Sequence, residues 1–223
     1  MKLLLFDIDG TLLSTSGAGI KAADKAFEKI YKIKNVMSGI KTDGKTDPMI
    51  LKEMFVAGLK REYRQSEADL IFDEYLRFLD SELLNGGKID ILPGIYELLV
   101  LLSTDSENLL GVATGNIEPG AWLKLRHCGL DKFFKFGGFG SDSDCREKLI
   151  LKAIDRSRDY SLSRIEKIYV IGDTPLDIIH GRAAGALTVA VATGRYTRSE
   201  LLSHEPDFIF DNLNNSADFL DIL

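Results

Sequence analysis

The sequence contains few cysteines and prolines and no long apolar run. Of its 223 residues, two are cysteines (Cys128 and Cys145) and five are prolines. So few cysteines argue against a disulfide-rich secreted fold and favour a reduced, cytoplasmic protein. No apolar stretch approaches the roughly 20 residues that a membrane-spanning helix needs. Asp7 also interrupts the N-terminal apolar run well short of a signal-peptide core, so we expect neither export nor a membrane partner.

Positive charge is also scarce. The sequence carries 28 Lys and Arg against 34 Asp and Glu, for a formal net charge of -6. This balance argues against a nucleic-acid partner. Hydrophobic residues make up 45% and charged residues 28% of the chain, as in an ordinary globular protein. A chain of this length accommodates one large domain or a domain with an insertion, and its composition leaves the oligomeric state open.

The N-terminal stretch carries the strongest structural signal. Leu3 to Phe6 form a short unbroken apolar run, which predicts a strand buried on both faces inside a parallel sheet. Two carboxylates, Asp7 and Asp9, follow directly, and Gly10 permits a sharp turn. Because ligand sites in open α/β sheets lie outside the carboxyl ends of the strands, we expect Asp7 and Asp9 to belong to a functional site.

Two different patterns follow this strand. The first predicts three amphipathic helices, at about 20–31, 49–59 and 68–84, without a convincing strand between them. A connection of that length is uncommon inside a compact α/β domain, so we interpret it as an insertion. In the second pattern strands alternate with helices. It predicts strands at 109–113, 134–139, 168–171, 187–192 and 208–210, helices at 95–102, 119–127, 146–158 and 176–184, and a short C-terminal helix.

Alternation of strands and helices predicts right-handed crossovers and a parallel sheet with both faces covered. We therefore predict an α/β fold with a Rossmann-like parallel-sheet core and an inserted α-helical cap domain. The core domain is expected to comprise residues 1–14 and 89–223, and the cap domain residues 15–88. The cap is a candidate lid over the strand ends.

Polar clusters recur at the predicted strand ends. They are Asp7 and Asp9, then Thr114, Gly115 and Asn116, then the region of Arg146 and Lys148, and last Asp173 and Asp177. In order and spacing they resemble motifs I to IV of the haloacid dehalogenase-like (HAD) phosphatases, whose motif I is Asp-x-Asp-Gly-Thr. The resemblance covers nearly the whole chain. The helical insertion between motifs I and II resembles the cap of phosphoglycolate phosphatase-like members.

This resemblance implies a Mg2+-dependent phosphatase that hydrolyses a small-molecule phosphate ester through an aspartyl-phosphate intermediate. It implies that Asp7 is the nucleophile, a role that suits a carboxylate because its ordinary pKa of ~3.9 leaves it ionised at neutral pH. It implies that Asp9 is the general acid/base. Dehalogenase members lack an acid at the position of Asp9, so its presence favours phosphate-ester hydrolysis or phosphoryl transfer.

The resemblance also implies a Mg2+ site. Asp7 and Asp173 would supply side-chain oxygens and Asp9 its backbone carbonyl, while Asp177 would bind the ion directly or support a ligand. Oxygen ligands suit Mg2+. Unit charges about 4 Å apart repel by ~4 kcal/mol at an effective dielectric of about 20, so clustered carboxylates need a cation or take up protons. The alternative role for Asp173 and Asp177 is to cap the helix that follows them.

The phosphoryl-binding residues are expected after the second core strand. The Thr114 hydroxyl and the backbone N–H groups of Gly115 and Asn116 are suited to hold phosphoryl oxygens, although a strand-end Thr also starts ordinary turns. Many family members carry a Lys-Pro pair at the start of the motif III helix, and this chain has none. Arg146 fits the helix register best as the catalytic cation, and Lys148 is the rival; a solvated helix face is the alternative for both.

The polar segment 42–47 resembles the specificity loop of these caps. Lys45 would contact a substrate anion when the cap closes, or the segment would only cap the helix that follows it. Two other functions share this architecture, a β-phosphoglucomutase-like phosphoryl transferase and a non-catalytic binding protein on a HAD scaffold. The second is expected to lack one of the acids, whereas Asp7, Asp9 and Asp173 are all present.

Overall fold

The sheet of the core is built around its first strand. In the computed structural model, which describes residues 1–85 and 89–223, β1 (Lys2–Phe6) pairs in parallel with β4 (Asn108–Ala113) and β6 (Lys167–Gly172). The strand order is β5-β4-β1-β6-β7-β8. The outer strands β5 (Gly137–Gly138), β7 (Leu187–Val191) and β8 (Phe208–Phe210) are parallel as well. The predicted α/β fold with a parallel sheet is therefore confirmed.

Side chains of β1 alternate between the two faces of the sheet, as the pleat requires. Leu4 and Phe6 pack on the face covered by α4 (Ile95–Thr104) and α5 (Glu118–His127). Leu3 and Leu5 pack on the opposite face, against α6 (Arg146–Ser157). All four side chains are fully buried. Helix α7 (Pro175–Ala183) packs against β6 and β7, so helices cover both faces of the sheet.

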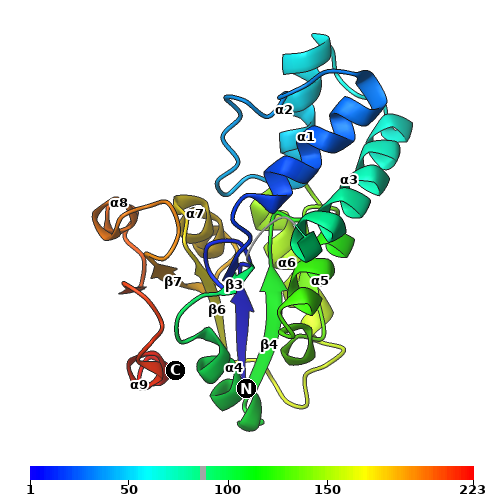
Figure 1. The fold of residues 1–223 in the computed structure, drawn as a ribbon. Helices are drawn as coiled ribbons and strands as arrows, with labels where there is room; N and C mark the ends of the chain where they lie inside the picture. Colours follow the sequence, from blue (N-terminus) through cyan, green and yellow to red (C-terminus); the bar gives the residue numbers. More distant parts are fainter. Residues whose placement is uncertain (86–88) are drawn as a thin grey trace.

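A helical insertion follows β1 and stands over the carboxyl ends of the strands (Figure 1). It contains α1 (Ala18–Tyr31), α2 (Asp47–Leu59) and α3 (Gln65–Asn85). Phe27, Phe55 and Ile71 belong to an apolar cluster inside the insertion. A second cluster, which includes Tyr75 and Ile117, joins α1 and α3 to α5 of the core. The predicted boundary between residues 88 and 89 adjoins residues 86–88, which lie outside the described residues, so the division into domains stays a prediction.

Some short elements differ from the sequence prediction. Two strands, β2 (Leu13–Ser14) and β3 (Asp90–Ile91), form an antiparallel pair at the two ends of the insertion. Two-residue strands are too short to give a periodic pattern. The predicted strand 134–139 is reduced to β5, and helix α8 (Arg198–Leu202) was not expected. The C-terminal helix is confirmed as α9 (Ser216–Leu220).

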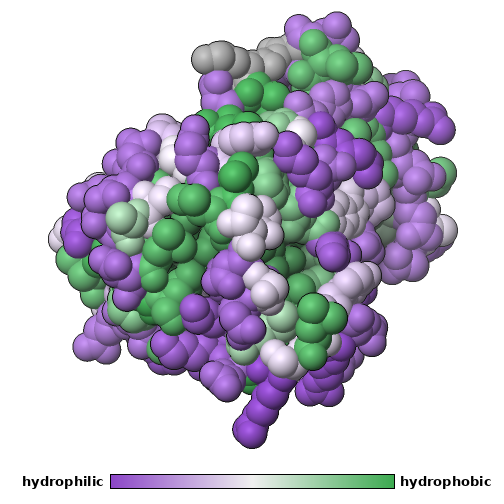
Figure 2. All heavy atoms as spheres, turned by 90° about the horizontal axis from the view of Figure 1, so that it is seen from below, coloured by the Kyte–Doolittle hydropathy of each residue, from purple (hydrophilic) through white to green (hydrophobic). Residues whose placement is uncertain are grey.

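The surface at the end of the core away from the insertion carries both hydrophilic and apolar side chains. Figure 2 views the molecule from below and shows hydrophilic side chains interspersed with apolar ones. Within residues 1–85 and 89–223, no helix has both the length and the apolar character that a bilayer crossing requires. Cys128 and Cys145 are not joined to each other.

Candidate active site

A cavity of about 280 Å3 lies where the strand ends of the core meet the insertion. From the core it is lined by Asp7, Asp9, Thr114, Arg146 and Asp173 among others, and from the insertion by residues of α1, α2, α3 and the segment 42–47. Its volume lies just below the roughly 300–1,000 Å3 usual for ligand sites, which favours a small metabolite. The strand ends therefore face a recess between the core and the insertion.

Asp7 lies directly beyond β1, inside this cavity. Its N–H donates to the carbonyl of Ile171 on β6 at 2.9 Å, and the residue is only 6% exposed. Nη2 of Arg146 lies 3.1 Å from its Oδ1. Burial raises the pKa of Asp7 to about 6, because the charged form loses its hydration; Arg146 opposes this shift, and Asp177 and Asp9 add to it.

Asp7, Asp173 and Asp177 form a cluster of buried carboxylates. One oxygen from each lies within 4.8 Å of the other two. The hydroxyl of Thr11 donates to Oδ1 of Asp173 at 3.0 Å. Burial, and then the charges of Asp7 and Asp177, raise the pKa of Asp173 well above its ordinary value. The predicted meeting of acids that are far apart in the sequence is thus present in the structure.

The turn after β1 requires glycine. Gly10 has a φ of +86°, and a Cβ on it would come within 2.4 Å of Oδ2 of Asp173. Both the left-handed backbone and the close approach exclude a larger side chain. The hydroxyl of Thr193 donates to the Gly10 carbonyl at 2.7 Å, which ties the turn to the loop after β7.

Arg146 joins this cluster as its cation. It is 4% exposed at the first position of α6, and its Nε and Nη2 lie 2.9 and 2.5 Å from Oδ1 of Asp177. Although burial opposes it, the charges of Asp177 and Asp7 raise the pKa of Arg146. Nη1 donates to the carbonyl of Gly44 in the insertion at 3.3 Å.

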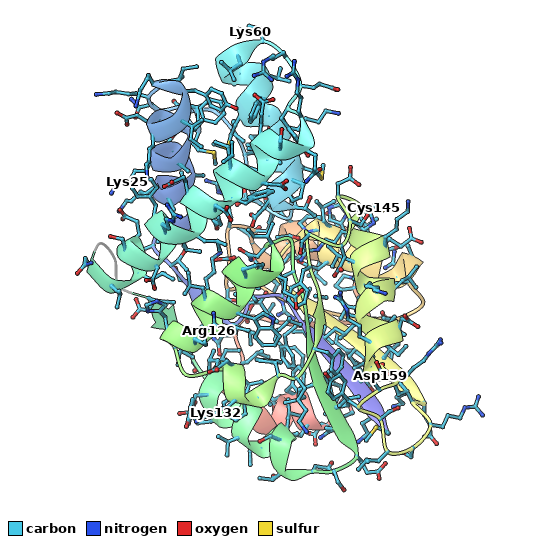
Figure 3. All side chains as sticks on the ribbon, turned by 90° about the vertical axis from the view of Figure 1, so that its right-hand side faces the viewer. Lys25, Lys60, Arg126, Lys132, Cys145 and Asp159 are labelled. Atoms are coloured by element: carbon cyan, nitrogen blue, oxygen red, sulfur yellow. The ribbon has the colours of Figure 1, made fainter. Side chains whose placement is uncertain are left out.

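Lys148, the rival cation, lies elsewhere. Its side chain is exposed on α6, and it is not among the cavity-lining residues. The reason is the helix register: Leu149, Ile150 and Ala153 face the core together with Arg146, which turns Lys148 outward. In Figure 3, Cys145, the residue before Arg146, lies at the end of the core that meets the insertion.

Asp177 caps a helix and also lies in the carboxylate cluster. Its Oδ2 accepts hydrogen bonds from the backbone N–H and the hydroxyl of Thr174, at 3.0 and 2.7 Å, in a capping box at the start of α7. Its Oδ1 accepts from Arg146 and belongs to the carboxylate cluster. The capping bonds hold the carboxylate in place, so the two roles are compatible.

The donor set of the cluster fits a divalent cation. In the part of the chain that the structure describes, three buried carboxylates face one guanidinium, that of Arg146, which leaves negative charge uncompensated. Oxygen-only donors suit a hard ion such as Mg2+. Among the residues described, the side chain of Asp9 is not part of the cluster, and binding of the ion by its backbone carbonyl stays a prediction.

The side chain of Asp9 instead enters a polar network with a residue that the sequence analysis missed. Its Oδ2 accepts from Nδ2 of Asn116 at 2.7 Å and from Nζ of Lys124 at 2.6 Å. Nζ of Lys124 also donates to Oδ1 of Asn116 at 2.6 Å, and Asn116 donates to the hydroxyl of Thr114 at 2.8 Å. Lys124 is 4% exposed on α5. Its helical spacing from Ile117 and the buried Ala121 was the available signal.

The insertion contacts the loop after β4. The N–H of Asp47 donates to the carbonyl of Gly115 at 2.8 Å, and its Oδ2 accepts from the N–H of Ile117 at 2.8 Å. A Cβ on Gly115 would lie 2.2 Å from the carbonyl of Lys45, so this approach requires glycine. Burial raises the pKa of Asp47 to about 6, opposed by Lys124 and by the hydrogen bond from Ile117.

Lys45 lines the cavity, and its contact with a substrate anion stays a prediction. Its Nζ lies 2.5 Å from Oε1 of Glu53 on α2. The neighbouring Thr46 caps α2, because its side chain accepts from the N–H of Met49 at 3.4 Å. The segment 42–47 therefore caps a helix and forms part of the cavity wall at the same time.

Comparison with known proteins identifies relatives over the whole chain. A model of haloacid dehalogenase-like hydrolases matches residues 4–191. The pyrophosphatase PpaX of Listeria welshimeri is 25% identical over 222 residues, which cover 95% of this chain and 93% of that protein. A hydrolase from Pseudomonas syringae shares the fold with a TM-score of 0.74 at 20% identity, over 100% of this chain and 99% of its own. A predicted phosphoglycolate phosphatase from Haemophilus somnus has a TM-score of 0.73 at 20% identity, over 100% and 97%.

Proposed function

Because the chain belongs to the haloacid dehalogenase-like hydrolases, we propose that it is a Mg2+-dependent phosphatase that hydrolyses a small phosphate ester through an aspartyl-phosphate. The observation that supports this proposal most strongly is the buried carboxylate cluster of Asp7, Asp173 and Asp177, in which Arg146 contacts Asp7 and Asp177. The names of the relatives, a pyrophosphatase and a phosphoglycolate phosphatase, support phosphoryl chemistry for this site.

In the first step a carboxylate oxygen of Asp7 attacks phosphorus, and the bond from phosphorus to the ester oxygen breaks. Asp9 donates the proton that this leaving oxygen needs. Thr114, Gly115 and Asn116 hold the phosphoryl oxygens, and Arg146 balances negative charge at Asp7. The products of this step are the free alcohol and an acyl phosphate on Asp7.

In the second step water attacks the phosphorus of this acyl phosphate. Asp9, now ionised, takes a proton from the water, and the bond between phosphorus and the Asp7 oxygen breaks. Free phosphate leaves, and the carboxylate of Asp7 and the acid form of Asp9 are restored. Lys124 and Asn116, which hold Oδ2 of Asp9, keep the carboxyl group oriented toward the cavity in both steps.

Asp7, Asp173 and the backbone carbonyl of Asp9 are the proposed Mg2+ ligands, with Asp177 beside them. When bound, the ion supplies positive charge that lets an anionic phosphoryl group approach the carboxylates. We assign residues 15–88 as the cap that excludes bulk water, with Lys45 at its cavity wall. The assignment as a cytoplasmic enzyme without a nucleic-acid or membrane partner belongs to the same proposal.

The test is a Mg2+-dependent assay with p-nitrophenyl phosphate, followed by sugar phosphates, nucleotides, phosphoglycolate and pyrophosphate. Wild type should release free phosphate only with Mg2+, and Asp7→Asn should be inactive with an unchanged circular dichroism spectrum. Sugar phosphate isomerisation without phosphate release would indicate a mutase instead. Inert protein with every ester would favour a non-catalytic binding role, and full activity of Asp7→Asn would exclude the mechanism.

A further inference from the structure

Tyr75 contributes a hydroxyl group to the catalytic cavity. The residue is 6% exposed on α3, and its ring packs near Gly120 of the core helix α5 and near Ile117, the residue before this helix. Within the described part of the chain its hydroxyl makes no hydrogen bond. Among the described residues, Asn108 Oδ1 is the one fully buried polar side-chain atom without a partner, so the Tyr75 hydroxyl is open to the cavity and available to a ligand.

The hydroxyl lies at the wall of the catalytic cavity. Tyr75 lines this cavity and also an adjoining apolar recess of about 30 Å3 between the insertion helices. A Cβ placed on Gly19 would lie 3.7 Å from the Tyr75 oxygen and 3.9 Å from Nζ of Lys124, so the hydroxyl is near the network that holds Asp9. Burial, reinforced by Asp47 and Asp9, keeps the pKa of Tyr75 well above its ordinary value, and the hydroxyl therefore remains a donor.

Asp47 adds an acceptor to the same wall. Its Oδ2 is engaged by the N–H of Ile117, and no residue in the described ranges donates to its Oδ1. Asp47 lines both the cavity and the recess, as Tyr75 does. The other side chains that line the recess are apolar, among them Ala23, Ile50 and Phe72. One donor and one acceptor beside an apolar recess match a hydroxyl group on a short carbon chain.

The same wall is poorly suited to a second phosphoryl group. The three cationic side chains that line the cavity are already paired, Arg146 with Asp7 and Asp177, Lys124 with Asp9, and Lys45 with Glu53. A phosphate at the wall would face the carboxylate of Asp47 without a free cation in the described residues. Burying an unpaired charge is costly, so the wall disfavours pyrophosphate and bisphosphates.

We propose that Tyr75 and Asp47 bind the leaving group of the substrate, and that this leaving group is a short, uncharged carbon chain that carries a hydroxyl. The Tyr75 hydroxyl donates to the substrate hydroxyl, which donates in turn to Oδ1 of Asp47, while the apolar side chains contact the carbon atoms. This inference rests on the proposed phosphatase function. It separates the chain from its pyrophosphatase relatives by substrate class.

The test compares glycerol phosphate with propyl phosphate, which differ only in hydroxyl groups. Tyr75→Phe removes a single oxygen atom, and Tyr160→Phe removes the same atom on an exposed residue outside the cavity. In wild type and Tyr160→Phe, kcat/KM should be clearly higher for glycerol phosphate, and pyrophosphate should be the poorest substrate. In Tyr75→Phe, kcat/KM for glycerol phosphate divided by kcat/KM for propyl phosphate should fall about tenfold, as expected for loss of one buried hydrogen bond.

A second readout measures binding without turnover. Calorimetry on Asp7→Asn with Mg2+ should give a lower Kd for glycerol phosphate than for propyl phosphate, and adding Tyr75→Phe should remove most of this difference. If Tyr75→Phe leaves the ratio of the two kcat/KM values unchanged, or if wild type prefers pyrophosphate, the leaving-group assignment is wrong. Neither result would contradict the phosphatase activity itself. Failure of wild type with every ester tested would reject the phosphatase proposal, and the ratio of the two dissociation constants would still show whether Tyr75 binds the substrate hydroxyl.

Discussion

Nζ of Lys124 lies 2.6 Å from Oδ2 of Asp9, and both groups also contact Asn116. The pair connects α5 to the turn after β1. The Lys124 side chain is 5% exposed, whereas that of Asp9 is 40% exposed toward the cavity. A buried ammonium that holds a half-exposed carboxylate orients it without covering it. Under the proposed mechanism Lys124 is a positioning residue for the general acid/base.

Replacing Lys124 should therefore affect turnover more than substrate binding. Lys124→Met keeps the length of the side chain and removes its charge, so Asp9 loses one of its two partners. We expect kcat with p-nitrophenyl phosphate to fall at least tenfold, equivalent to about 1.4 kcal/mol, with KM within about twofold. Lys152→Met on the exposed face of α6 is the control. A rise in KM at constant kcat would indicate a substrate-binding role instead.

Arg146 and Lys148 give a direct test of which cation serves Asp7. Arg146→Lys keeps the charge but loses the planar fork that contacts Asp177 and Asp7 together. We expect it to lower kcat/KM tenfold or more and to lower the melting temperature, since both carboxylates are buried. Lys148→Met should stay within about twofold of wild type on both measures. The reverse order of effects would restore Lys148 as the cation.

The sequence predicted the architecture because its signals are local. The apolar run of β1, the alternation of strands and helices that follows it and the helical insertion each give a pattern of apolar residues within single elements. The short pair β2 and β3 has no such pattern. β5 was predicted too long because its neighbourhood contains several aromatic residues that pack as part of the core without extending the strand.

The candidate site was only partly predictable for a related reason. Asp7, Asp9, Asp173 and Asp177 follow strand ends, and strand ends of a parallel sheet meet at one edge. Lys124 and Tyr75 lie in the middle of helices, and their importance depends on how α5 and α3 pack on the core. A lysine on the buried side of a helix is visible in the sequence, but its partner Asp9, 115 residues away, is not.

Binding of Mg2+ should be measurable as thermal stabilisation. An ion that binds only the folded state at a hundred times its Kd adds about 2.7 kcal/mol, which for a chain of this size raises Tm by roughly 5–10 °C. Asp173→Asn retains an acceptor for the Thr11 hydroxyl but removes a ligand charge, so its Tm should hardly respond to Mg2+. Asp155→Asn, on the surface of α6, should respond as wild type does. An equal response in Asp173→Asn would remove this residue from the metal site.

Asp47 should contribute a distinct pH dependence to stability. Its pKa is raised to about 6 from an ordinary 3.8, chiefly by burial, so the folded state binds this proton more tightly than the unfolded state. The favourable contribution is present below about pH 4 and is lost as pH rises through about 6. The free energy of unfolding of wild type, measured in urea, should therefore fall between pH 4 and pH 7 by roughly 1–3 kcal/mol more than that of Asp47→Asn. Parallel profiles for the two proteins would contradict this assignment.

The most direct test of the account is to trap the phosphoryl group on the protein. Wild type mixed with Mg2+ and a phosphate ester that it turns over, then quenched in acid within one turnover, should give a phosphorylated peptide that contains Asp7. Mass spectrometry locates the group, and Asp7→Asn treated in the same way should carry none. If wild type releases phosphate but carries no phosphoryl group on Asp7, or carries it on another residue, the aspartyl-phosphate mechanism is contradicted.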